Sequence, residues 1–182
     1  ASRAYVMSPP LRTPADQDLL WDALADGTIQ FVGTDHCSFT LAGQKAAAAD
    51  FAHTPNGGPG LELRMGLLYT YGVAAGRLTP ERFVEVTSTN AAKYFGLYPR
   101  KGVLAPGSDA DIVVYDPNGE HLVRHADLHD ATDHTPYEGL PLRGRVRDVF
   151  LRGEHLVRGG DLAAGEPTGR FVSRALPDSD IR

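Results

Sequence analysis

Residues 33–37 (Gly-Thr-Asp-His-Cys) carry the side chains best suited to chemistry, and they directly follow the apolar run 29–32. That run predicts a buried strand, and barrels of parallel strands and helices keep their catalytic side chains at the carboxyl ends of the strands. A carboxylate there, Asp35, is suited to binding Zn²⁺ and to taking a proton from a metal-bound water. A turn or helix-cap acid is the alternative, and the spacing alone leaves both open. The neighbouring His36 is expected to be a structural, hydrogen-bonding histidine.

Ser8 and Asn56 are candidates for substrate binding. Ser8 follows the short run 5–7, which is predicted to be a strand ended by two prolines, so Ser8 and Asp35 are expected to face the same end of a barrel. Asn56 lies in residues 54–60 (Thr-Pro-Asn-Gly-Gly-Pro-Gly), whose composition predicts a shaped turn. Exposed backbone amides and carbonyls in such a turn suit recognition of a planar amide or imide. Plain turn residues are the alternative at both positions.

A second possible metal site is a series of histidines, His121, His125 and His129, with His134 beyond. On a helix, residues spaced by four share one face and are able to bind a metal together. The segment is a poor helix candidate, however, because it follows Pro-Asn-Gly at 117–119 and is diluted by aspartates and threonines. No metal site is therefore predicted there.

Composition restricts the class of protein. The 182 residues are 42% hydrophobic and 23% charged, which is ordinary for a folded domain. A net charge of −5 argues against nucleic acid or an anionic membrane as the main partner. No run approaches the ~20 apolar residues needed to span a bilayer, and the first residues do not read as a signal peptide. The single cysteine, Cys37, excludes an internal disulfide, is expected to be a small, partly buried residue, and fits a cytoplasmic location.

The first half of the chain predicts a βαβ unit followed by helices. Thr13 as N-cap, Pro14 at the first helical position and Asp16 at the third predict a helix that ends at Gly27. With the strand-like runs before and after it, this helix would complete a unit of a parallel sheet. The further expectations are a helical turn within 45–50, a helix over 61–75, a second from Thr79-Pro80 and a third capped by residues 88–90.

From about residue 97 the pattern changes to β structure. Residues 107–111 lead into a β-branched run at 112–115, which the turn residues 116–119 are expected to end. Residues 146–151 and 155–157 flank Arg-Gly-Glu and predict a hairpin. The tail from Asp161 is polar and is expected to be mobile or to lie on another subunit.

Taken together, these segments resemble the C-terminal portion of the D-hydantoinase/dihydropyrimidinase group of the cyclic amidohydrolases. Each segment is a weak signal, and their common order makes the resemblance specific. The resemblance runs from about residue 4 to residue 160. The segments that carry it are residues 5–12, 33–37, 55–60, 83–93, 97–102 and 107–114.

The resemblance implies an α/β fold: residues 1–96 would hold the last strands and helices of a (β/α)8 barrel, 97–160 part of a small β-sandwich, and 161–182 a polar tail. It implies hydrolysis of the cyclic amide bond of dihydropyrimidines or hydantoins at a site with two metal ions, usually zinc, in an enzyme that is often a tetramer. Asp35 matches the aspartate that binds one metal and moves the proton to the leaving nitrogen. Ser8 and Asn56 match positions that hold the substrate, largely through their backbones.

Most of the metal centre implied by the resemblance lies outside this chain. An H-x-H pair, a carboxylated lysine, two further histidines and a tyrosine would precede it. A single carboxylate does not retain zinc, so the chain by itself is expected to be inactive. The alternatives are a non-catalytic scaffold of the same fold, and an enzyme acting on allantoin or dihydroorotate. Retention of Asp35 favours an enzyme, and the segments around Ser8 and Asn56 favour the hydantoinase branch.

Overall fold

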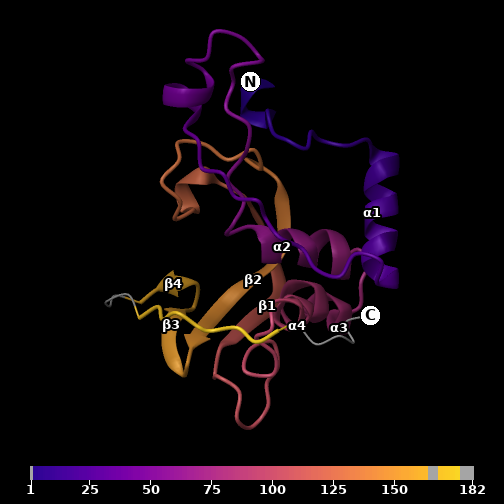
Figure 1. Ribbon diagram of the computed structural model, residues 1–182. Coiled ribbons are helices and arrows are strands. Elements are labelled where there is room, and N and C mark those ends of the chain that lie inside the picture. The colour runs from indigo at the N-terminus through magenta and orange to yellow at the C-terminus, as the bar shows by residue number, and fades with distance from the viewer. Residues whose placement is uncertain (1, 164–167, 177–182) are drawn as a thin grey trace.

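The computed structural model describes residues 2–163 and 168–176. In Figure 1 the helices of residues 14–26, 64–73 and 80–94 lie to the right of the sheet. None of the helices in the described residues is long and apolar enough to cross a bilayer. The helical elements are η1 Ser2–Tyr5, α1 Pro14–Asp26, η2 Leu41–Lys45, α2 Arg64–Leu68, η3 Tyr69–Val73, α3 Pro80–Val84, η4 Glu85–Thr89, α4 Asn90–Tyr94 and η5 His125–Asp127. The strands are β1 Ile112–Leu122, β2 Pro141–Leu151, β3 Glu154–Arg158 and β4 Asp161–Leu162.

Helix α1 begins and ends where the sequence predicts. The Thr13 hydroxyl accepts the backbone N–H of Asp16 at 3.3 Å, and the Asp16 carboxylate accepts the backbone N–H of Thr13 at 3.1 Å. This capping box satisfies two amides that have no partner inside the helix. Gly27 ends the helix with φ 93°, a left-handed conformation that glycine adopts without a steric cost.

The helix predicted over 61–75 is present as α2, which continues through the π-helical turn η3. The second predicted helix also starts as expected, because the Thr79 hydroxyl accepts the Arg82 backbone N–H at 3.1 Å. The third predicted helix is present as α4, but the prediction that residues 88–90 cap it is wrong. Thr89 has helical angles, φ −59° and ψ −48°, so the chain runs from α3 through the π-helical turn η4 into α4 without a break.

The two strands expected before residue 97 are absent from the sheet, and this prediction was wrong for the described residues. Tyr5 is the last residue of the 3-10 turn η1, and residues 6–7 belong to no strand. Ile29 lies in a bend, and residues 30–32 have no regular structure and join no ladder. A strand needs a neighbouring strand, and here helices satisfy the backbone instead. The N–H of Val32 donates to the Val86 carbonyl at 3.0 Å, and the Val32 carbonyl accepts from the Arg64 guanidinium at 2.9 Å.

The short helical turn expected within 45–50 lies earlier in the chain. Turn η2 ends at Lys45, and the residues after it form turns and bends. The Lys45 side chain points inward and is fully buried, which the alanines that follow it did not indicate.

The strands form one antiparallel sheet in the order β1-β2-β3-β4. Strand β1 is longer than predicted, since residues 116–119 form a bulge inside it: Asp116 pairs with Arg145, and pairing resumes at Glu120 with Arg143. The predicted hairpin is confirmed as β2 and β3. Its turn residues Arg152 and Gly153 have φ 50° and 83°, the signs that a tight hairpin turn requires.

Two apolar clusters hold the elements together. Leu24, Leu78 and Val86 pack between α1 and the later helices, and the side chain of Val86 has no exposed surface. Full burial of one such side chain contributes about 1.5–3 kcal/mol. The second cluster, Leu63, Val123 and Leu142, joins the chain just before α2 to the sheet.

Polar and aromatic contacts reinforce the packing of η3 on the sheet. The backbone N–H of Arg143 donates to the Thr70 hydroxyl at 2.9 Å. The rings of Tyr69 and Tyr115 lie 4.6 Å apart between centroids, and burial raises the pKa of Tyr115 to about 12.

Two parts of the tail are described: residues 161–163, which include β4 paired with β3, and residues 168–176, which fold back on the chain. The Ala175 backbone N–H donates to the Gly96 carbonyl at 2.9 Å, which ties the tail to the end of α4. The remaining tail residues lie outside the described part of the chain.

Candidate functional site

The Asp35 side chain is exposed, and it follows the irregular segment 30–34. Its backbone has φ 43°, and it is one of two described non-glycine residues with positive φ. Aspartate tolerates this left-handed conformation better than most residues, yet it is uncommon and concentrates at functional sites. The unusual backbone conformation therefore falls at the residue that the sequence singles out.

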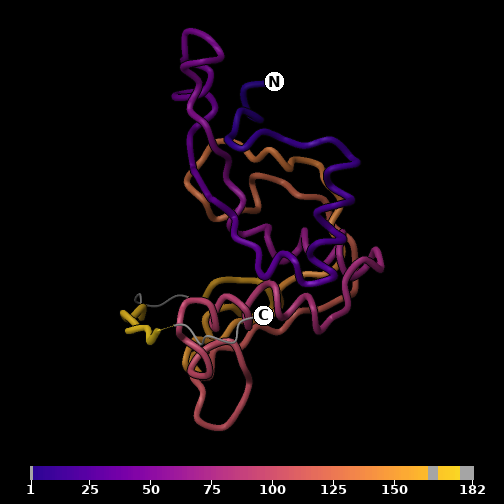
Figure 2. Tube along the Cα trace, turned by 45° about the vertical axis from the view of Figure 1, so that its right-hand side comes forward, coloured from indigo at the N-terminus to yellow at the C-terminus, as the bar shows by residue number. Residues whose placement is uncertain are grey.

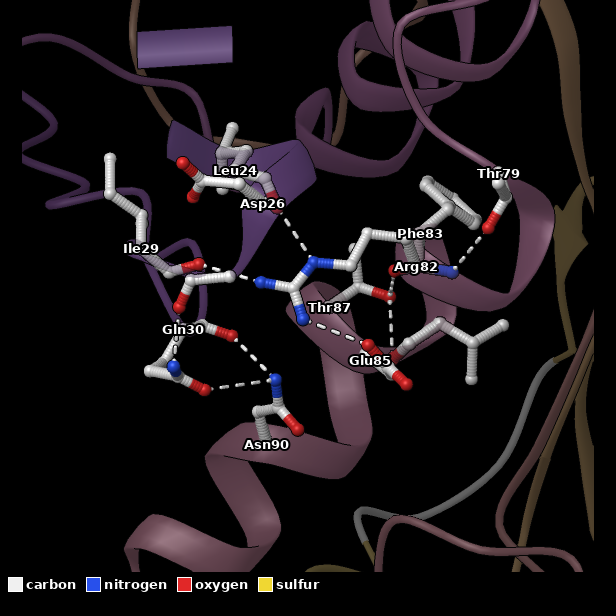
Figure 3. A network of polar contacts seen from close by, with 12 residues as sticks. Leu24, Asp26, Ile29, Gln30, Thr79, Arg82, Phe83, Glu85, Thr87 and Asn90 are labelled. Atoms are coloured by element: carbon white, nitrogen blue, oxygen red, sulfur yellow. Dashed lines mark hydrogen bonds and ion pairs between the residues drawn. The ribbon is translucent and has the colours of Figure 1, made fainter. Parts of the chain in front are cut away.

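The segment leading to Asp35 is held by a polar network centred on Arg82 (Figure 3). Its guanidinium donates to the Leu24 carbonyl at 2.6 Å and to the Ile29 carbonyl at 2.8 Å, and it pairs with the Glu85 carboxylate at 2.8 Å. Asn90, expected to cap a helix, instead donates its side-chain amide to the Gln30 carbonyl at 2.9 Å. Helices α3 and α4 thereby fix the path of the chain towards Asp35.

The residues after Asp35 are bonded to the loop of Asn56. The His36 Nδ1 atom accepts the backbone N–H of Gly60 at 3.1 Å and that of Leu61 at 3.2 Å. The Cys37 backbone N–H donates to the Gly58 carbonyl at 3.2 Å. His36 is therefore structural, as predicted, and its bonds set the loop against the Asp35 segment.

The segment of Ser8 is bonded to the other side of the same loop. The Gly57 backbone N–H donates to the Val6 carbonyl at 3.1 Å. Ser8 and Asn56 are both exposed, as is Asp35. The structure thus brings the three candidate segments together through backbone hydrogen bonds and leaves the three side chains open to solvent.

A buried lysine, Lys45, which the sequence did not indicate, also connects the Ser8 segment to the Asn56 loop. The Lys45 side chain has 0% exposure, and its ammonium donates to the carbonyls of Val6 at 2.8 Å and Pro55 at 2.9 Å. Burial lowers the pKa of this amine. A lysine before four alanines carries no sequence signal for a buried role, because most lysines are exposed.

The histidine series does not form a metal site. His121 lies in β1, the ring of His125 bonds to the Thr132 carbonyl at 2.9 Å, and His129 pairs with Glu62 at 2.9 Å. The ring of His134 is buried and both its nitrogens lack hydrogen-bond partners. Within residues 2–163 and 168–176, no group of three or more histidine, cysteine or acidic residues is arranged to hold a metal ion.

The described residues therefore do not fit a complete metal centre, and Asp35 alone offers one carboxylate. Structural and catalytic zinc sites use at least three protein ligands.

A cavity of about 600 Å³ lies elsewhere, between the start of α2 and the sheet. Its lining includes Glu62, His121 and Arg145 but none of Ser8, Asp35 and Asn56, so it is not part of this site.

Comparison with known proteins places this geometry in a family. The amidohydrolase family matches residues 8–156 of the chain. A D-phenylhydantoinase of Escherichia coli O81 (strain ED1a) is 46% identical over 171 residues, which are 93% of this chain and 37% of that protein.

Solved structures agree. The D-hydantoinase of Bacillus sp. AR9 superposes with a TM-score of 0.94 at 42% identity, over 97% of this chain and 39% of that one. The D-hydantoinase (dihydropyrimidinase) of Thermus sp. gives a TM-score of 0.91 at 46% identity, over 95% of this chain and 38% of that one. The chain thus spans well under half the length of the relatives it matches, and it belongs to the amidohydrolase family, in the D-hydantoinase/dihydropyrimidinase group.

Proposed function

We propose that this chain is the C-terminal part of a metal-dependent enzyme that hydrolyses the cyclic amide bond of dihydropyrimidines or hydantoins. Asp35 is its catalytic and metal-binding residue, and Ser8 and Asn56 are its substrate-binding residues. The observation that carries the proposal is the bonding of the Asp35 and Ser8 segments to opposite sides of the Asn56 loop. Similarity to hydantoinases over nearly the whole chain supports the same reaction class.

In this proposal each segment has a separate task. Asp35 supplies one carboxylate to a zinc centre whose other ligands come from outside this chain, and bound zinc would supply an activated water and polarise the ring carbonyl. The backbone groups around Ser8 and Asn56 orient a planar amide by hydrogen bonding, which is the recognition that such exposed loop groups offer. The division of labour predicts that Asp35 governs turnover, whereas the other two segments govern substrate affinity.

The exposed surface of the chain is larger than that of a compact monomer, which supports the proposal that other parts of the protein cover it. The chain exposes 11815 Å², whereas a compact monomer of 19.6 kDa is expected to expose about 8,600 Å². Large apolar side chains such as Leu19, Phe51 and Leu104 are 68%, 77% and 72% exposed. A surface of this kind is normally covered by packing. The isolated chain should therefore associate readily, bind zinc weakly and hydrolyse nothing.

The remaining parts of the proposal follow the same resemblance. Residues 1–96 would belong to the last strands and helices of the barrel, 97–160 to a small β-sandwich and 161–182 to a polar tail. The whole enzyme is expected to be a cytoplasmic homo-oligomer, with tetramers the first expectation. It would act on a small cyclic amide or imide and would not engage nucleic acid or membrane.

The decisive test is substitution of Asp35 in the full-length protein. Asp35→Asn keeps a residue that tolerates positive φ, so it isolates the loss of the carboxylate from backbone strain. The expected result is a loss of bound metal and a decrease in kcat of about 10²–10⁴-fold with hydantoin or dihydrouracil. Asp22→Asn is the matched control, since Asp22 is an exposed acid of α1. Unchanged metal content and turnover in Asp35→Asn would refute the role of this carboxylate.

The same assays separate the alternatives. A full-length protein that binds no metal and hydrolyses no cyclic amide would be the non-catalytic scaffold. Activity on allantoin or dihydroorotate, without activity on hydantoins and dihydropyrimidines, would show an enzyme of the same reaction class with a different ring as its substrate.

A further inference from the structure

Lys45 is a fully buried cation whose partners are backbone carbonyls. Its side chain has 0% exposure, and within the described residues it forms no ion pair with a carboxylate. Burying an ammonium is costly unless its donors are all well used.

The two carbonyls belong to the two segments that carry the candidate substrate-binding residues. Val6 precedes Ser8 by two residues, and Pro55 directly precedes Asn56. The Lys45 ammonium bonds Val6 at 2.8 Å and Pro55 at 2.9 Å, so one nitrogen spans both segments. The Val6 carbonyl also accepts the Gly57 backbone N–H at 3.1 Å. The separation of the segments is therefore set by one ammonium and one backbone bond.

The turn η2, which carries Lys45, is itself held by hydrogen bonds from side chains in other parts of the chain. The Asp133 carboxylate accepts the Ala42 backbone N–H at 2.9 Å at the start of η2. Arg3 donates to the Ala48 carbonyl at 2.8 Å just after it. Figure 1 and Figure 2 both show the N-terminal segment beside residues 40–60 at one end of the molecule. These hydrogen bonds hold the backbone of the turn, so the position of Lys45 is fixed by its surroundings.

We propose that Lys45 is a positioning residue for substrate binding, which fixes the distance between the Ser8 segment and the Asn56 loop without touching the substrate. This inference rests on the proposed function, because it gives that site its spacing. A lysine suits the task because its long stem reaches through the interior and its ammonium presents three donors with no fixed plane. An apolar side chain of equal length would leave the half-buried Pro55 carbonyl without this donor and would leave the Val6 carbonyl with the Gly57 N–H alone.

The test uses the full-length protein with Lys45→Met and Lys45→Arg. For Lys45→Met we expect KM for hydantoin or dihydrouracil to rise about tenfold or more, with kcat within about threefold and metal content unchanged. Lys45→Arg keeps donors and should recover part of the loss. A lysine with a merely structural role would instead lower the amount of folded enzyme and leave KM unchanged, and that result would overturn the proposal. Lys93→Met, on α4, is the matched control.

Amide hydrogen exchange gives a readout that does not depend on catalysis. The Gly57 amide should exchange faster in Lys45→Met, and protection in α1 and in β2 should be unchanged. If Lys45→Met does not fold, Lys45→Gln, which keeps an amide donor on a shorter stem, takes its place in both measurements. A full-length wild type without hydrolysis would refute the proposed function alone. The exchange result would still decide the spacing role: faster exchange confined to residues 5–8 and 54–58 supports it, and uniform or unchanged exchange overturns it.

Discussion

His36 and Gly60 are joined by a hydrogen bond of 3.1 Å in which the Gly60 backbone N–H donates to Nδ1 of the imidazole. A backbone N–H only donates, so Nδ1 must be the unprotonated nitrogen and the ring proton lies on Nε2. The residue next to Asp35 thus holds the loop of Asn56 with its side chain. The conformation of the Asn56 loop therefore depends on the His36 imidazole as well as on backbone hydrogen bonds.

Substitution of His36 should therefore loosen the Asn56 loop, and the effect should be larger when the new side chain has no hydrogen-bond acceptor. His36→Leu removes the acceptor for two amides, and we expect Gly60 and Leu61 to exchange about fivefold faster, corresponding to about 1 kcal/mol. His36→Asn places an oxygen close to the position of Nδ1 and should retain most of the protection. Amide exchange in the full-length protein measures both. Equal exchange in the two variants would show that the ring acts by packing alone.

Gly57 is the glycine of this loop that no other residue should replace. Its φ is 138°, and a Cβ built there would lie 2.4 Å from the Cys37 Cβ. Gly57→Ala should lower the free energy of unfolding by about 2–4 kcal/mol, from backbone strain and overpacking together. Cys37→Ala should give no relief, because the clashing Cβ remains. Chemical denaturation measures both variants and their combination.

Gly60→Ala is the control for that prediction. A Cβ at Gly60 would lie 3.6 Å from the Tyr137 ring, an ordinary contact, so its effect should stay within about 0.5–1 kcal/mol. If Gly57→Ala were tolerated as well as Gly60→Ala, the described geometry of the loop would be wrong.

Asp111 and Asp109 both bind Lys101 but should differ in their effect on stability. Asp111 also accepts the Arg152 backbone N–H at 2.8 Å and so ties the β2–β3 turn to the preceding loop. The Asp109 carboxylate instead pairs with two side chains, Lys101 at 2.9 Å and Arg100 at 3.0 Å.

Asp111→Ala should cost about 1–3 kcal/mol, whereas Asp109→Ala should cost about 0–1 kcal/mol. Thermal unfolding of both variants tests the difference. Asp111→Asn keeps an acceptor for Arg152 and should fall between them. A larger effect at Asp109 would contradict the assignment.

The contact between His129 and Glu62 predicts a pH dependence. The Glu62 carboxylate accepts a hydrogen bond from the His129 ring and raises the pKa of His129 above its usual value. Between that value, about 6.5, and the raised pKa, the folded state binds more protons than the unfolded state, so the free energy of unfolding falls as pH rises. NMR titration should show the His129 pKa returning towards 6.5 in Glu62→Gln, with this part of the pH dependence lost. An unchanged titration curve would exclude Glu62 as the cause.

Local signals in the sequence predicted the parts of the fold that short segments control. Thr13 and Thr79 start helices because a hydroxyl and an amide three residues apart form a cap without help from the rest of the chain. The hairpin at Arg152 and Gly153 was predictable for the same reason. The continuation of the helix through Thr89 was not, because Asn90 bonds to Gln30, sixty residues earlier in the chain.

The sequence by itself determined which residues are available for chemistry: Asp35 shortly after an apolar run, and Ser8 and Asn56 in segments rich in proline and glycine. Only the tertiary structure decided how these segments meet. Residues 29–32 are held by helices rather than by neighbouring strands, and a lysine that reads as a surface residue lies buried between the Ser8 segment and the Asn56 loop. The physical reason is that a hydrogen bond between Lys45 and Val6, 39 residues apart, leaves no periodicity or composition in the sequence around either partner.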